Sequence, residues 1–211
     1  MTQSRVTHTL LILHNCAAEA ERHYVFNSGA DTMLKYLVPY SKSSNPSVSF
    51  DAKIVLLHIA PYLSKSDFHY LLLSSDQTKL VVSSLRNAIK NSETMLSLYG
   101  GTCSMVEVIV WLEHAALLEE NVDLMINHGI LELFPSLIRI QDQDTAIKGA
   151  KLLWTIACLD KVKKILCQSS DVTTFLKTSP NLKISKYVLH CIQLSDAGEV
   201  FNKYYESAFK R

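Results

Sequence analysis

The feature that most constrains this chain is a short helical pattern that recurs along its length. In each copy, an apolar run carries a polar residue near its centre and ends in small or apolar residues. The copies are Leu13–Ala17, Leu56–Ala60, Leu112–Ala116, Leu153–Ala157 and Val188–Ile192. Helical self-similarity at intervals of roughly forty residues is the sequence signature of an α-solenoid, whose stacked repeats present an extended surface. The pattern therefore predicts an all-α fold that acts by binding.

Glycine and proline are scarce, with 6 and 5 copies in 211 residues. Folds built from strands and turns use these residues at every hairpin, so their scarcity favours helices joined by short loops. Hydrophobic residues make up 48% of the chain and charged residues 19%. This composition is typical of a folded globular protein and argues against intrinsic disorder.

The net charge of +1 lacks the basic excess of proteins that bind the phosphate backbone, so no nucleic-acid partner is expected. No segment approaches the roughly 20 apolar residues that a membrane span requires, so no membrane partner is expected either. The five cysteines are scattered and never form a Cys-x-x-Cys pair. Such cysteines predict buried thiols in a reducing compartment, and hence a cytoplasmic protein.

The pattern predicts a single domain over residues 1–211, built from successive helical repeats. We expect these repeats at residues 4–44, 49–91, 104–141, 144–178 and 181–211, with an irregular insertion at 91–103. The insertion carries Gly100-Gly101 at its tip and explains the longest interval between two copies of the pattern.

Polar residues mark several expected helix ends. Ser104 and Glu107 form a capping-box sequence directly before an apolar run, and Ser74-Ser75-Asp76 predicts another helix start. Two runs that end in glycine, Asn27–Gly29 and Asn127–Gly129, predict helix stops. The amphipathic segment Val200–Lys210 is expected to cap the last repeat, because a terminal repeat would otherwise expose an apolar face.

Each unit is interpreted as a long helix, a short helix, a break at Gly or Ser/Asp, and another long helix. This order resembles the armadillo repeat, and Leu13–Leu37 is the closest match, with Asn15 in its first helix and Gly29-Ala30 before its last. The resemblance implies a right-handed superhelix of about four to five repeats that binds a protein or peptide partner. A HEAT-like solenoid is the alternative architecture.

The segment Ala150–Ala157 also resembles the diverged armadillo regions of multidomain invertebrate signalling proteins that carry TIR modules. This second resemblance implies a regulatory fragment whose effector lies elsewhere. The two resemblances share the expectation of a non-catalytic interaction module.

The central polar residues of the recurring pattern form a column along the expected solenoid. In armadillo proteins, the equivalent helices line a concave groove in which asparagines hold the main chain of an extended peptide. An amide and a neutral imidazole each offer a donor and an acceptor to a peptide backbone. The partner-binding groove is therefore predicted at Asn15, His58, His114, Thr155 and His190. The alternative is that these side chains satisfy buried carbonyls between adjacent repeats.

The sequence carries no sign of catalysis, a metal or a cofactor. No Cys/His cluster has zinc-ligand spacing, and neither the Gly-x-x-x-x-Gly-Lys loop nor the Gly-x-Ser-x-Gly motif occurs. We therefore expect a protein that is not an enzyme. The rival hypothesis is a small-molecule or nucleotide sensor with a pocket that contains His58 and His114.

Charge is unevenly distributed along the second half of the chain. Residues 104–144 carry many carboxylates against Arg139, whereas residues 145–190 are rich in lysine. These segments are interpreted either as solvated convex faces or as surfaces that steer a dipolar partner or support head-to-tail self-association.

Overall fold

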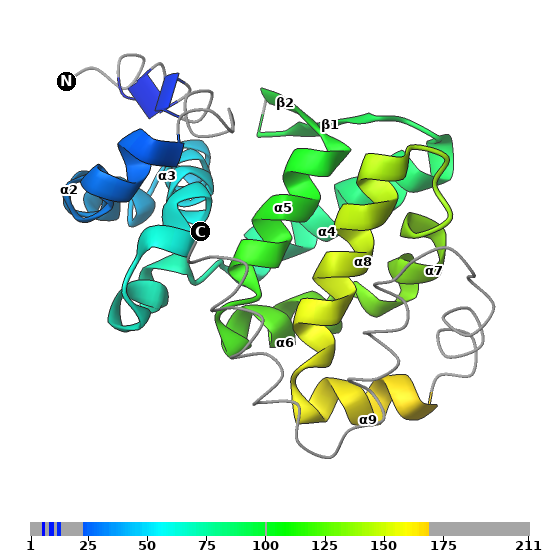
Figure 1. The fold of residues 1–211 in the computed structure, drawn as a ribbon. Coiled ribbons are helices and arrows are strands. Elements are labelled where there is room, and N and C mark those ends of the chain that lie inside the picture. Colours follow the sequence, from blue (N-terminus) through cyan, green and yellow to red (C-terminus); the bar gives the residue numbers. More distant parts are fainter. Residues whose placement is uncertain (1–5, 7–8, 11, 14–22, 100, 169–211) are drawn as a thin grey trace.

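The computed structural model describes residues 6, 9–10, 12–13, 23–99 and 101–168, and it is mostly helical over this part of the chain (Figure 1). The elements follow in the order α2 (His23–Ser41), α3 (Pro46–Ile59), η2 (Ala60–Tyr62), η3 (Lys65–Leu71), α4 (Ser75–Asn91), β1 (Met95–Leu98), β2 (Gly101–Ser104), α5 (Met105–Ala115), α6 (Glu119–Asn127), η4 (Leu131–Leu133), α7 (Phe134–Leu137), α8 (Gln143–Ala157) and α9 (Asp160–Gln168). The expected repeat at 181–211 and the expected cap Val200–Lys210 lie outside the described residues.

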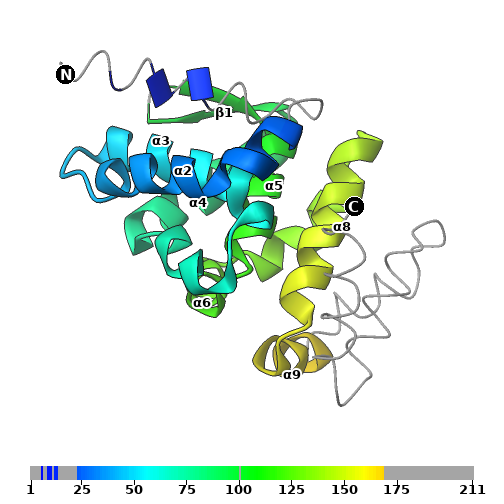
Figure 2. The ribbon, with the colours of Figure 1, turned by 60° about the vertical axis from the view of Figure 1, so that its left-hand side comes forward.

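Three helices that are separated along the chain lie next to one another in chain order. Helix α3 packs against α5, and α5 packs against α8, so that α5 is the middle member of what we call the α3–α5–α8 row (Figures 1 and 2). Helix α2 covers α3, α4 contacts both α5 and α6, and α7 contacts α8. The row is therefore backed by a second set of helices.

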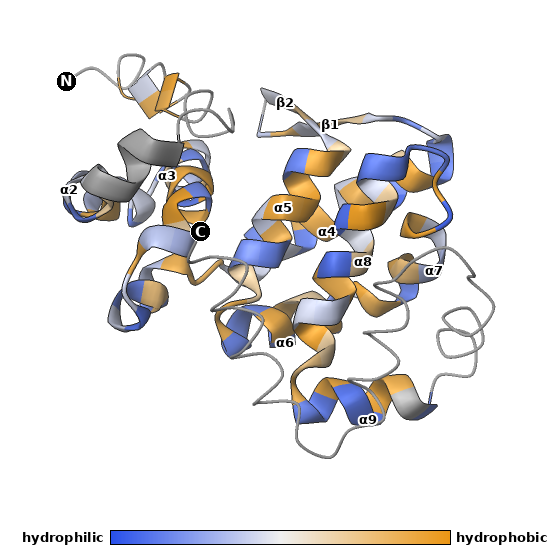
Figure 3. Cartoon of the chain, viewed as in Figure 1, coloured by the Kyte–Doolittle hydropathy of each residue, from blue (hydrophilic) through white to orange (hydrophobic). Residues whose placement is uncertain are grey.

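The hydrophobic core lies between the row and the helices behind it. Helix α5 is the most apolar of the row and most of its residues are buried, as the orange ribbon of Figure 3 reflects. The largest fully buried side chains come mainly from helices between α2 and α7, and include Leu37, Leu57, Leu85, Leu112, Met125 and Phe134. Each such side chain contributes about 1.5–3 kcal/mol through burial, and together they belong to one apolar core.

The two predicted helix starts are confirmed. Ser104 Oγ accepts a hydrogen bond from Glu107 N at 3.2 Å, and Glu107 Oε2 accepts one from Ser104 N at 2.7 Å. The same reciprocal pair links Ser74 and Gln77 at the start of α4. The predicted stop after Asn127 is confirmed as well, because α6 ends there and Gly129 takes a positive φ of 81°.

The predicted helix stop at Asn27–Gly29 is wrong, because α2 runs without a break from His23 to Ser41. A glycine inside a helix costs only about 1 kcal/mol relative to alanine. Packing of α2 along α3, through buried residues such as Leu34 and Leu37, outweighs that cost. Pro39 is accommodated within the last turns of the helix.

The insertion at 91–103 is not irregular, which corrects the prediction. Strands β1 and β2 form an antiparallel hairpin in which Met95 pairs with Ser104 and Leu98 pairs with Gly101. Leu96, Leu98 and Cys103 are buried on its inner side. The Tyr99 ring, 4.9 Å from the Phe50 ring between centroids, attaches the turn to α3. The described chain is therefore mainly helical with one small two-stranded sheet.

The connection between α6 and α8 is only partly helical. A 3₁₀ turn, η4, leads into the short helix α7, which ends at Leu137. None of the described helices is both long and apolar enough to cross a membrane.

The fully buried side chain of Asn121 links three segments, one of which lies 48 to 50 residues earlier in the chain. Its Oδ1 accepts a hydrogen bond from Leu73 N at 2.9 Å. Its Nδ2 donates to Leu71 O at 3.0 Å and to Ala115 O at 2.9 Å. One amide thus ties the start of α6 to the end of α5 and to the connection between η3 and α4.

Candidate partner-binding face

Two members of the predicted column meet at the contact between α3 and α5. His58 is only 9% exposed, and its Nε2 accepts a hydrogen bond from Trp111 Nε1 at 3.0 Å. Because a ring nitrogen that accepts carries no proton, this bond places the proton of a neutral His58 on Nδ1. The two rings meet edge to face. His58 therefore belongs to the packing of α3 against α5.

His114 adds a second donor to a backbone carbonyl near the end of α3. The carbonyl of Leu57 already accepts from the N–H of Ala60, the residue that follows the helix. His114 Nδ1 lies 2.7 Å from Leu57 O, and because a carbonyl can only accept, Nδ1 is the donor. The ring is half-buried. At His114 the structure thus shows a carbonyl contact of the kind that the packing alternative predicts, whereas the bond of His58 is to the Trp111 indole.

Thr155 lies on α8, the helix that packs against the other side of α5. Its Oγ1 donates to Lys151 O at 3.1 Å, within the same helix. Lys148, Lys151 and Thr155 are half-buried and lie at helical spacing, so they follow one side of α8. The remaining column members, Asn15 and His190, lie outside the described residues.

The structure therefore places His58, His114 and Thr155 on three helices that pack side by side in chain order. His58 and His114 are brought together at one helix contact, while Thr155 belongs to the next helix of the row. Of the three, His114 and Thr155 retain partial exposure.

Glu113 is a buried carboxylate within the acidic segment 104–144, which the sequence suggested as a solvated face or a steering surface. It is 9% exposed, and burial raises the pKa of its carboxyl group, an effect that Lys148 and Lys151 of α8 partly oppose. It has no hydrogen-bond partner among the described residues. A signal was present in the sequence, since Glu113 stands inside the apolar run of α5 rather than at its edge.

Glu113 should make the stability of the protein depend on pH. A raised pKa in the folded state means that the folded protein keeps this proton over a pH range in which the unfolded chain releases it. Stability is then highest below the ordinary pKa of glutamate and decreases as pH rises through the raised value. We expect Glu113→Gln to be more stable than wild type at pH 8 by on the order of 1 kcal/mol, because a neutral amide costs less to bury than a charge.

The measurement is a series of Tm values between pH 4 and pH 9. The Glu113→Gln variant should show a flatter profile than wild type. Glu120→Gln, on the exposed side of α6, is the matched control and should follow the wild-type profile. Parallel curves for wild type and Glu113→Gln would contradict the assignment.

Part of the charge that suggested self-association is paired within the chain. Lys161 Nζ, on α9, lies 2.8 Å from Glu119 Oε1 and 2.6 Å from Asp123 Oδ1, both on α6. Lys163 Nζ lies 2.9 Å from Asp160 Oδ1. The acidic and basic segments thus meet inside one molecule at the contact between α6 and α9.

The described cysteines Cys103 and Cys158 carry free thiols. Burial, followed by the nearby Glu107 carboxylate, raises the pKa of Cys103 to about 12, so its thiol stays protonated at neutral pH. Among the described residues, no group of three or more His, Cys, Asp or Glu side chains is arranged to hold a metal ion.

Comparisons of the chain with protein-family models, with curated proteins and with solved structures found no match.

Proposed function

We propose that this protein is a non-catalytic interaction scaffold, an armadillo-like helical solenoid whose partner segment binds along the α3–α5–α8 row. The observation that carries the proposal is the placement of His58, His114 and Thr155 on α3, α5 and α8, each helix packed against the next, with His114 and Thr155 partly exposed. Polar side chains on neighbouring helices of one row can bind an extended peptide, because the peptide backbone offers a donor and an acceptor at each residue.

Partial exposure along the middle and last helices of the row supports the same proposal. Val110 and His114 lie one turn apart on α5, and Lys151 and Thr155 lie one turn apart on α8; all four are half-buried. Half-buried polar and apolar side chains together provide both area and hydrogen bonds for a partner. The partner class is a protein or peptide.

The rival hypothesis of a small-molecule pocket around His58 and His114 has less support. His58 Nε2 is bonded to Trp111, and His114 Nδ1 to Leu57 O. A ligand at this position would have to compete with contacts that join α3 to α5.

The test is selection of binding peptides from a random displayed library with the whole chain as bait. Thr155→Arg places a large charged side chain on the row, and it should weaken the selected peptides at least about tenfold, the effect of losing roughly 1.4 kcal/mol. Leu72→Arg is the matched control, because Leu72 is 42% exposed in the connection between η3 and α4, outside the three helices of the row.

The control variant should bind the selected peptides like wild type. Equal weakening by both variants, or selection of peptides that neither variant affects, would contradict a binding face on the row. Circular dichroism on each variant verifies that both remain folded.

A further inference from the structure

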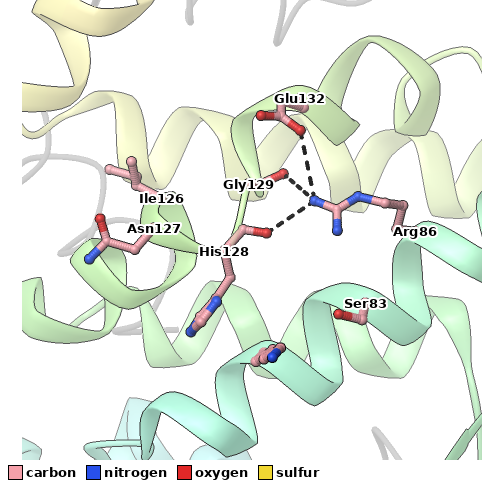
Figure 4. A pocket seen from close by; sticks show the side chains of 8 residues that line it. Ser83, Arg86, Ile126, Asn127, His128, Gly129 and Glu132 are labelled. Atoms are coloured by element: carbon pink, nitrogen blue, oxygen red, sulfur yellow. Dashed lines mark hydrogen bonds and ion pairs between the residues drawn. The ribbon is translucent and has the colours of Figure 1, made fainter.

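An open cavity of about 350 Å³ lies between α4 and the turn that follows α6, on helices other than the α3–α5–α8 row (Figure 4). Helix α4 contributes Lys79, Ser83 and Arg86, whose spacing of four and three residues places them on one side of the helix. The opposite wall is the chain from Ile126 to Glu132. Arg86 and Ser83 face this wall across the cavity.

The Arg86 guanidinium is held in place by one of its three nitrogens. Nη2 donates to His128 O at 3.0 Å and to Gly129 O at 3.2 Å, and it lies 3.8 Å from Glu132 Oε2. Nη1 and Nε have no hydrogen-bond partner among the described residues. A guanidinium that is already fixed loses little side-chain entropy when its remaining N–H groups bind a ligand.

Gly129 makes this close approach possible. It has a φ of +81°, and a Cβ atom at this position would come within 2.6 Å of Arg86 Nη2. The two carbonyls that hold Arg86 lie just after the C-terminus of α6, where backbone carbonyls lack helical N–H donors. The arginine thus satisfies the helix end and is oriented by it.

Hydrogen-bond donors outnumber available acceptors around the cavity. Lys79 is exposed, Ser83 is half-buried, and neither side chain has a hydrogen-bond partner among the described residues. The carbonyls of His128 and Gly129 are occupied by Arg86, and His128 Nε2 shares a hydrogen bond with Ser75 Oγ at 3.0 Å. Lys79 and Arg86 supply two positive charges, and Glu132 supplies a negative charge whose side chain is 79% exposed.

We propose that this cavity binds the phosphate group of a small phosphate monoester. An ammonium, a hydroxyl and a fixed guanidinium edge offer donors from successive turns along one side of α4, and together they can reach several terminal oxygens of a phosphate. The volume of about 350 Å³ exceeds that of a bare phosphate and falls at the small end of ligand sites, which leaves room for the organic part of the molecule.

The experiment is an NMR titration of the whole ¹⁵N-labelled chain with inorganic phosphate and with phosphoserine, at constant ionic strength and with acetate as the competing anion. Phosphoserine should produce saturable shifts with a Kd on the order of 1 mM. Shifts should centre on α4 and on the turn around Gly129. Acetate binding as tight as phosphate would overturn the phosphate assignment in favour of a carboxylate site.

Charge variants with opposite expected signs make the test specific. Lys79→Gln and Ser83→Ala should each weaken phosphoserine binding about fivefold to tenfold, through the loss of a charge-assisted or neutral hydrogen bond. Glu132→Gln should tighten binding severalfold, because it removes the negative charge beside Arg86. Lys65→Gln, an exposed lysine on η3, is the control and should leave binding unchanged.

The absence of saturable shifts up to about 50 mM phosphate, well above the expected Kd, would overturn the proposal. Equal weakening by Lys65→Gln and Lys79→Gln would overturn the proposal too, since the effect would then come from the net charge of the protein and not from a specific site. Selective binding of phosphopeptides without binding of free phosphoserine would assign the cavity to a macromolecular partner instead.

Discussion

The Asn121→Asp variant is expected to lose several kcal/mol of folding stability. The amide donates to Leu71 O and Ala115 O and accepts from Leu73 N, with no exposed surface. An aspartate carboxylate can only accept, so both carbonyls lose their donor and face a buried negative charge. Each unsatisfied buried group costs about 1–3 kcal/mol and a buried charge costs more, which places the loss on the order of 4 kcal/mol.

The measurement is urea unfolding at pH 7, followed by circular dichroism. Asn45→Asp is the matched control, because the same substitution falls there on a side chain that acts only as an acceptor. Asn45 Oδ1 accepts from Ser47 N at 3.0 Å and from Val48 N at 3.2 Å, as the N-cap of α3. Aspartate is an equally good N-cap, so the free energy of unfolding of the Asn45→Asp variant should stay within about 0.5 kcal/mol of wild type. Similar losses for the two variants would show that the donor role of Asn121 is not what matters.

Alanine substitutions at two glycines, one inside a helix and one in a turn, are expected to have opposite effects on stability. Gly129→Ala should lower the free energy of unfolding by about 2–3 kcal/mol, because an alanine at positive φ costs about 1–2 kcal/mol and its Cβ would displace Arg86. Gly29→Ala should raise it by up to about 1 kcal/mol, since Gly29 lies inside α2 with nothing within 4 Å of its Cβ position.

The same urea experiment measures both variants. Destabilisation by Gly29→Ala would show that this position needs a glycine, against the continuous α2 helix. A Gly129→Ala variant as stable as wild type would contradict the left-handed turn after α6 and the contact between Gly129 and Arg86.

The elements that could be predicted from the sequence are those set by neighbouring residues. The starts of α4 and α5 depend on hydrogen bonds between residues three apart, such as Ser104 and Glu107. The end of α6 depends on Gly129 adopting a left-handed conformation one residue past the cap. Local hydrogen bonding of this kind is the same in any fold, so the sequence pattern was enough to predict these helix ends.

The errors occurred where distant contacts compete with local preference. Gly29 is a reasonable stop signal in isolation, but α2 continues through it because its apolar face packs along α3. The insertion forms a hairpin in which Leu96, Leu98 and Cys103 are buried against the core. Its turn also contacts Phe50 of α3, a residue about fifty positions away, which local sequence cannot reveal.

For the candidate sites the division follows the same principle. Helical periodicity in the sequence predicted the row of recurring polar positions, and with it the adjacent helices that carry His58, His114 and Thr155. The partners of those side chains were decided by tertiary structure alone. Trp111, Leu57, Asn121 and the carbonyls around Arg86 meet their partners across roughly forty to sixty residues of chain, a separation that periodicity cannot resolve. The mainly helical character of the chain, the starts of α4 and α5 and the end of α6 followed from the sequence, because those depend on contacts within a few residues. Only packing decided which polar groups became buried, because burial depends on what arrives from elsewhere in the chain.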